Sequence, residues 1–182
     1  RRIVYLIETN IDKDMNIVEI VRSIFPAKTK DFVTAVDEHS IILVKELREK
    51  ETMDEIEKIA KMISDTLSTE LNIKVYISIG TVVSDLKDVS RSYKEAKMAL
   101  EVGKIFESEK YIVNYEKLGI GRLIYQLPLS LCKMFIKEVL HGLTMDDFDE
   151  ETLATVNKFF ENNLNVSETS RQLSTEILSY TD

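Results

Sequence analysis

The chain has 182 residues, 44% of them hydrophobic and 31% charged, with only five Gly and two Pro. This composition provides apolar material for a sizeable core and excludes disordered and low-complexity classes. The formal net charge is −8, so the chain as a whole repels phosphate and anionic lipid, and contact with nucleic acid requires a local patch.

The chain contains a single cysteine, Cys132, which cannot form an intramolecular disulfide. A lone thiol suits a reducing compartment, so we expect a cytoplasmic protein with Cys132 as a small core residue. No apolar run approaches the roughly 18 residues of a membrane-spanning helix, and we expect no membrane contact. Because the chain enters a strand-like run without an initiator Met, we expect it to be a piece of a longer polypeptide.

Strand and helix patterns alternate in the first two thirds of the chain. The clearest helix has apolar residues at steps of three and four from Met53 to Leu67, and Thr52 with Glu55 matches the S/T-x-x-E capping box at its start. In chain order, the patterns predict a strand over 2–8, a helix over 13–25, a hairpin of strands over 32–36 and 40–47, a helix over 53–67, a strand over 73–79, a helix over 88–106 and a strand over 111–113.

This order predicts an α+β fold that contains the split βαβ, or ferredoxin-like, unit. In that topology the first strand runs parallel to the first strand of the hairpin, and the second strand of the hairpin lies between them. The hairpin tip, residues 37–39, is therefore expected at the same sheet edge as Glu8. Carboxylates converge at that edge.

The chain from Gly119 onward is expected to be entirely helical. Apolar residues from Leu129 to Leu140 form a stripe after Pro128, and Leu153, Val156 and Phe160 mark a second helix. Asn residues then turn the chain, Asn165 with Glu168 gives a second cap signal, and a short helix is predicted to about Leu173. Two short helices joined by a tight turn are typical of the opening of a helix-turn-helix, although any helical hairpin has the same periodicity.

Two stretches resemble known families. The strand Tyr76-Ile77-Ser78-Ile79-Gly80, followed by the helix Ser92-Tyr93-Lys94-Glu95-Ala96-Lys97-Met98-Ala99-Leu100, resembles the end of a GGDEF-type cyclase palm. Its S-Y-x-E-A pattern is similar to the degenerate GGDEF-like domain of PucR and CdaR regulators, which control purine and sugar-diacid catabolism. Residues 152–173, TLATVNKFFENNLNVSETSRQL, resemble the first two helices of the helix-turn-helix that ends these regulators.

The resemblance implies three segments: a GGDEF-like α+β domain over 1–116, a helical linker over 117–145 and a partial helix-turn-helix over 146–182. It implies a fragment of a transcription regulator of catabolic genes that binds DNA in its full-length form and acts as a homo-oligomer. The α+β domain would couple or dimerise, and an inducer would bind a separate sensor.

The second resemblance ends before the recognition helix. Residues 174–182 contain no Lys, Arg or His, whereas the family continues into a basic H-R-N-T-like run. Since a helix that reads the major groove needs basic or amide side chains, we expect that this fragment does not read DNA by itself. Contacts with the DNA backbone are expected from the second helix, at Ser167, Thr169, Arg171 and Gln172.

The same resemblance raises the alternative of a nucleotide-binding or residual diguanylate-cyclase-like domain that uses Glu8, Asp37 and Glu38. In gapless alignment, Ala35 and Val36 stand where the family has the two glycines of G-G-D-E-F. Glycines let the hairpin backbone approach a nucleotide and adopt positive φ, and Ala and Val obstruct both. We therefore expect no enzyme activity and no cofactor.

Other candidate sites are weaker. His39 and His141 lie far apart in sequence and lack the spacing of a zinc site, so no metal site is expected. Gly119-Ile120-Gly121 is a bare G-x-G motif and is interpreted as a connector. The acidic residues of 146–151 are interpreted as a solvated linker that favours the N-terminus of the next helix.

Overall fold

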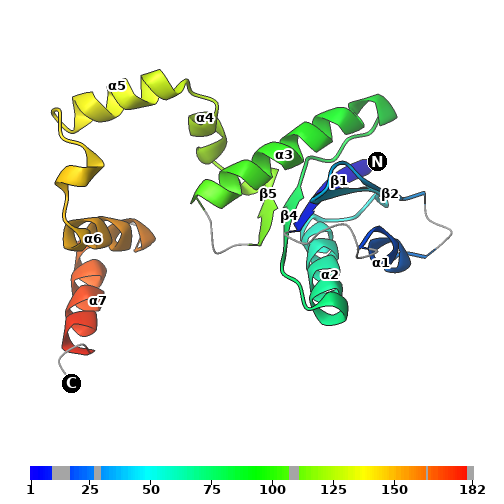
Figure 1. Cartoon of the computed structure of the whole chain (residues 1–182), viewed down its shortest axis with the longest axis horizontal. Coiled ribbons are helices and arrows are strands. Elements are labelled where there is room, and N and C mark those ends of the chain that lie inside the picture. The colour runs from blue at the N-terminus through cyan, green and yellow to red at the C-terminus, as the bar shows by residue number, and fades with distance from the viewer. Residues whose placement is uncertain (10–16, 27–29, 107–110, 163, 180–182) are drawn as a thin grey trace. The chain divides into compact units, whose positions relative to one another are not determined.

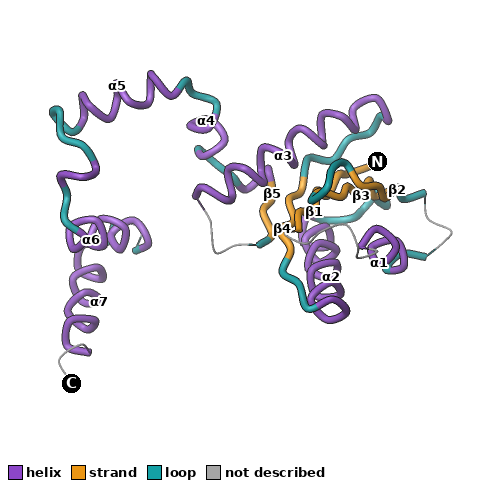
Figure 2. The backbone as a smooth tube through the Cα atoms, viewed as in Figure 1, coloured by secondary structure: helices purple, strands orange, loops and turns teal. Residues whose placement is uncertain are grey.

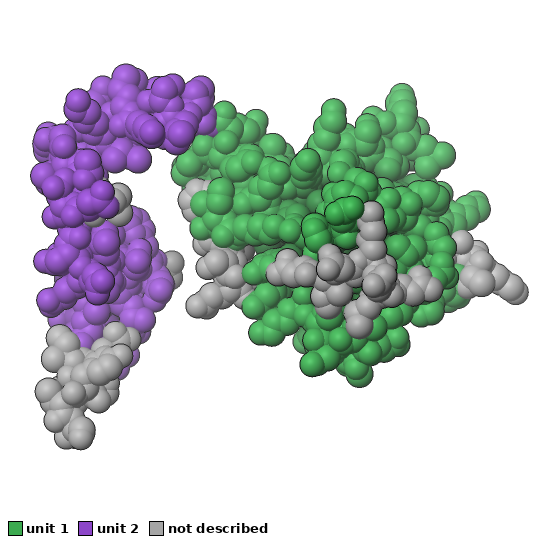
Figure 3. Space-filling view, viewed as in Figure 1, with its two compact units in different colours: residues 1–126 green, residues 127–182 purple. Residues whose placement is uncertain are grey.

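The structure is a computed structural model that describes residues 1–9, 17–26, 30–106, 111–162 and 164–179. The chain divides into two compact units, Arg1–Gln126 and Leu127–Asp182 (Figure 3). Within the described residues, no helix is long and apolar enough to cross a membrane.

A five-stranded sheet forms the centre of the first unit (Figures 1 and 2). The strands follow the order β2-β3-β1-β4-β5, and all neighbouring pairs are antiparallel except β4 and β5. Because β3 lies antiparallel between β1 and β2, those two strands run parallel, as the sequence predicts. The strands are β1 (Arg2–Thr9), β2 (Phe32–Ala35), β3 (Ser40–Glu46), β4 (Val75–Ile79) and β5 (Ile112–Asn114).

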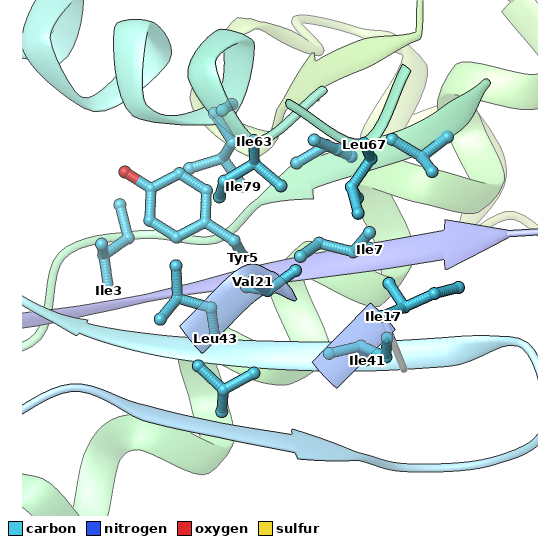
Figure 4. Packing of buried hydrophobic residues seen from close by; sticks show 14 of the residues in the cluster. Ile3, Tyr5, Ile7, Ile17, Val21, Ile41, Leu43, Ile63, Leu67 and Ile79 are labelled. Carbon is cyan, nitrogen blue, oxygen red and sulfur yellow. The ribbon is translucent and has the colours of Figure 1, made fainter. Parts of the chain in front are cut away.

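Helices cover both faces of this sheet. Alternate residues of β1, such as Tyr5 and Ile7, pack with residues of α1 (Ile17–Ser23) and α2 (Met53–Leu71) into the larger core cluster (Figure 4). The residues between them, such as Leu6, face α3 (Val89–Phe106) in a smaller cluster. Coverage on both faces explains why β1 is a continuous apolar run.

The predicted elements of this unit are present with modest differences in their ends. The helix expected over 13–25 is described only as α1, since residues 10–16 lie outside the described part. The capping box of α2 is confirmed: the backbone N–H of Glu55 donates to the Thr52 hydroxyl at 3.4 Å, and the Glu55 carboxylate accepts from the Thr52 N–H at 2.7 Å. This pair satisfies two donors that the first turn leaves open.

Gly80 and Ser92 bring α3 unusually close to the sheet. A Cβ atom at Gly80 would lie 2.1 Å from the backbone oxygen of Ser92, so only glycine fits there. The buried Ser92 hydroxyl accepts a hydrogen bond from the N–H of Val4 at 3.1 Å and donates to the Thr81 carbonyl at 2.7 Å. Ser92 therefore joins the start of α3 to β1 and to the end of β4.

The region after β5 is helical, as predicted. The short helix α4 (Gly121–Tyr125) belongs to the first unit, where the Tyr125 hydroxyl is hydrogen bonded to the Glu101 carboxylate of α3. The second unit contains α5 (Leu129–Val139), α6 (Glu150–Glu161) and α7 (Val166–Ser179). Gly119 adopts a φ of 55° in the turn before α4, in agreement with its interpretation as part of a connector.

Two expectations for the second unit are wrong. The last helix does not end near Leu173 but continues to Ser179, because residues 174–179 contain no Gly, Pro or Asn to break it. Cys132 is not a core residue, because it lies half-buried on α5, a helix without buried residues. Among the described residues of this unit, Thr169 alone is buried.

Candidate functional site

The sheet edge at the end of β1 gathers the acidic residues that the sequence predicts there. Glu8 lies beside Ser40 of β3 and Tyr76 of β4, and it shares the α3-facing side of β1 with Leu6. The hairpin tip is tied to the same edge, because the N–H of Thr9 donates to the His39 carbonyl at 2.9 Å. The proximity of Glu8 to the tip is therefore confirmed.

A shallow hollow of about 390 Å³ lies between this edge and α3. Glu8, Asp37 and Glu38 line it from the sheet side, and α3 contributes basic and acidic side chains. The charged side chains of α3 that line the hollow are Lys97, Glu101 and Lys104. All three carboxylates of the alternative nucleotide site thus lie around one space, together with two lysines.

Glu8 is neutralised by a direct ion pair with Lys104. The Lys104 ammonium lies 2.6 Å from one oxygen of the Glu8 carboxylate and 2.7 Å from the other. The Lys104 nitrogen also lies 5.8 Å from the centre of the Tyr76 ring, at a cation–π distance. The Lys104 ammonium therefore compensates the negative charge of Glu8, which would otherwise attract a metal ion.

Asp37 is engaged in the turn of the hairpin. Its carboxylate accepts a hydrogen bond from the N–H of His39 at 2.9 Å, and this bond holds the pKa of Asp37 below its usual range. The arrangement is an Asx turn, a local way to close a tight loop. None of residues 35–40 adopts positive φ, so the tip closes without the backbone geometry that glycines would supply.

The carboxylates around the hollow do not form a chelating set. Among the described residues, no three His, Cys, Asp or Glu side chains are close enough together to hold a metal ion. His39 lies at the tip, whereas His141 follows α5 in the other unit with a φ of 51°. These two histidines therefore belong to different units.

Comparison with known protein families matches residues 1–102 to the GGDEF-like domain. The match covers more than half of the chain and runs from β1 to the last turn of α3. The chain belongs to the GGDEF-like domain family. No curated protein matches the chain.

The matched residues place the candidate site within the GGDEF-like domain. Glu8 and the hairpin tip lie inside the match, and Lys104 lies just beyond its end. Sequence reasoning missed Lys104, although a signal was present. Lys104 follows Leu100 by four residues and therefore continues the stripe of α3 that faces the sheet.

A second missed contact supports the fold of the GGDEF-like domain beside Ser92. The Glu95 carboxylate is hydrogen bonded to the Thr81 hydroxyl and accepts from the Thr81 N–H at 3.3 Å. Together with Ser92, Glu95 fixes the segment that follows Gly80. The S-Y-x-E-A pattern therefore contains two residues, Ser92 and Glu95, that hold the helix against the sheet.

The four residues expected at the DNA backbone lie in the first two turns of α7. The Asn165 carboxamide caps this helix by accepting from the N–H of Glu168 at 3.1 Å, as the sequence predicts. Ser167 is exposed, and the Arg171 guanidinium is paired with the Glu168 carboxylate, with an N–O distance of 3.0 Å. This ion pair raises the pKa of Arg171 and lowers that of Glu168.

Thr169 and Gln172 connect α7 to the end of α6. Thr169 is 5% exposed and donates its hydroxyl to the Asn165 carbonyl at 2.8 Å. The Asn162 carboxamide donates to Thr169 at 3.3 Å and to the Gln172 side chain at 3.2 Å. These bonds fix the angle between the two helices, so both residues have a structural role in the pair.

Proposed function

We propose that this chain is part of a PucR/CdaR-type transcription regulator of catabolic genes. In this proposal the GGDEF-like domain is not an enzyme; it couples or dimerises subunits. Residues 146–182 form the start of a helix-turn-helix that binds DNA in the longer protein. We place that protein in the cytoplasm.

The observation that carries the non-catalytic assignment is the ion pair between Glu8 and Lys104. Phosphoryl transfer with Mg²⁺ needs carboxylates that are open to the metal and a backbone that can approach the nucleotide. Here Lys104 binds both oxygens of Glu8, and Asp37 accepts from the backbone of its own turn. Ala35 and Val36 occupy the glycine positions, so the residues present do not fit a nucleotide with its metal.

The geometry of α6 and α7 supports the DNA-binding part of the proposal. A hollow of about 420 Å³ lies between the two helices, lined mainly by apolar residues such as Val156, Phe159 and Leu173. In a helix-turn-helix, a third helix covers such a surface and enters the major groove. We assign phosphate contacts to Ser167 and Arg171, and Thr169 and Gln172 position the helix from inside the pair.

Titration calorimetry with GTP and Mg²⁺ tests the non-catalytic assignment. We expect no binding heat from the wild-type chain and none from Lys104→Met, which removes the ammonium that neutralises Glu8. Asp37→Ala is the matched variant for the alternative site. Clear binding by the wild-type chain that disappears in Asp37→Ala would overturn the proposal and favour a nucleotide-binding domain.

Selection from a pool of random DNA duplexes tests the regulator assignment. We expect the natural polypeptide that contains this chain to enrich one sequence, with weaker binding in Arg171→Ala. The 182-residue chain alone is expected to enrich none. Failure of the longer polypeptide to select a sequence would contradict the regulator role, and a specific, steeply salt-dependent complex of the 182-residue chain would contradict the need for a further helix.

A further inference from the structure

The helix α5 carries a wide apolar face that nothing in the second unit covers. Leu129 is 69% exposed and Phe135 is 63% exposed, and no residue of the helix is buried. At 3.6 residues per turn, the apolar side chains occupy about half of the circumference. Ser130 lies on the opposite arc, and Lys133 and Lys137 lie between Ser130 and the edge of the apolar face. The exposed members of the apolar face are Leu129, Leu131, Phe135, Ile136 and Val139.

The size of this face is near the upper limit of what a monomer usually exposes. Its five exposed side chains present on the order of 550 Å², taking roughly 200 Å² for a fully exposed side chain of this size. The largest apolar patch on a typical monomer is about 300–600 Å². A stable dimer buries about 800 Å² on each partner, which the face and the stems of its flanking lysines together supply.

The charges around α5 favour a second copy as the partner. A two-fold interface requires both complementary groups on one chain, because each copy presents the same surface. The second unit meets this requirement: Lys133 and Lys137 lie on α5, and five of the six residues over 146–151 are acidic. Lysines of one copy can therefore face the acidic segment of the other.

We infer that α5 is a self-association helix, which packs its apolar face against α5 of a second copy of this chain. This inference goes beyond the proposed function, since it concerns residues 127–151 and does not depend on DNA binding. It assigns the contact between subunits to the helical unit, and of the two roles proposed for the GGDEF-like domain it leaves coupling. Burial of Leu129, Phe135 and Val139 drives the association, and the charged rims orient it.

Analytical ultracentrifugation of the 182-residue chain over a range of concentrations tests the inference. We expect a reversible dimer, and Phe135→Glu should raise its dissociation constant by about tenfold or more, because a charge would be buried in the interface. Ser130→Glu is the matched control: it adds the same charge on the polar arc and should leave the constant unchanged. Both side chains are exposed, so circular dichroism should show unaltered helix content in both variants.

Two outcomes would overturn the inference. A wild-type chain that stays monomeric at all concentrations would show that α5 does not self-associate. A dimer that persists in Phe135→Glu would place the contact on another surface, such as the GGDEF-like domain. Because Cys132 is the only cysteine and lies on α5, a short bis-maleimide provides a second readout. It should join two wild-type copies at this residue and fail to join Phe135→Glu chains.

Discussion

The two units of this chain are stabilised in different ways. The first encloses a core in which Tyr5, Leu43 and Leu67 are fully buried between the sheet and its helices. The second consists of amphipathic helices, and Thr169 is its one buried residue in the described part of the chain. The GGDEF-like domain is therefore stabilised by burial of a hydrophobic core, whereas the helical unit relies on local caps and leaves its apolar faces exposed.

Truncation of one large side chain in each unit should give the largest difference in the free energy of unfolding between the two units. Leu43→Ala removes a fully buried side chain of β3 and should lower the free energy of unfolding by about 2–5 kcal/mol. Phe160→Ala, on the exposed face of α6, should change it by less than about 0.5 kcal/mol. Urea denaturation followed by circular dichroism measures both values. Similar losses in the two variants would refute the difference between the units.

Two buried serines of the first unit differ in whether their hydroxyl groups are hydrogen bonded. Ser92→Ala should lower the free energy of unfolding by about 1–3 kcal/mol, because the buried N–H of Val4 and carbonyl of Thr81 lose their partner. The buried Ser78 hydroxyl has no hydrogen-bond partner among the described residues. Ser78→Ala should therefore be neutral or stabilising. Thermal unfolding of both variants tests this, and equal destabilisation would contradict the assigned bonds.

Acid should destabilise the start of α6 by protonating the Asp149 carboxylate that caps it. The side chain and N–H of Thr152 hydrogen bond to the Asp149 carboxylate at the start of α6 and lower its pKa. A carboxyl group with a lowered pKa in the folded state stabilises the fold above its unfolded pKa of about 4 and loses that effect as the pH falls through the folded value. We therefore expect faster amide exchange at Thr152 in acid.

Asp149→Asn is the matched control for this titration. Asparagine is also a good N-cap residue but does not ionise, so exchange at Thr152 should become independent of pH between about 5 and 2.5, after correction for intrinsic exchange rates. A variant with the same acid transition as the wild-type chain would show that another group controls the start of α6.

Local sequence signals predicted most of the fold. The Thr52 and Glu55 box begins α2, and Asn165 begins α7, because a cap involves residues only three positions apart. The position of β3 between β1 and β2 followed from connection rules, which placed the hairpin tip beside Glu8. These features depend on neighbours in sequence or on topology, and both can be derived from the chain.

Contacts between distant side chains were less predictable. Lys104 reaches Glu8 across 96 positions, and no local pattern gives that distance. The full length of α7 was also missed, since the resemblance to a helix-turn-helix suggested a stop near Leu173 that no residue enforces. The apolar stripe of α5 was correctly recognised, but a stripe shows only that one face is apolar, and no residue of α5 is buried within the described part of its unit.

The close approach of Gly80 to Ser92 restricts how this domain can evolve. Any side chain at position 80 would force α3 away from the sheet, and that shift would break the two hydrogen bonds of Ser92 and move the helix end that carries Lys104. A change at position 80 is therefore tolerable only with compensating changes at position 92 and at the Glu8 edge. We expect these positions to vary together among relatives of this chain, as a coupled set rather than as independent sites.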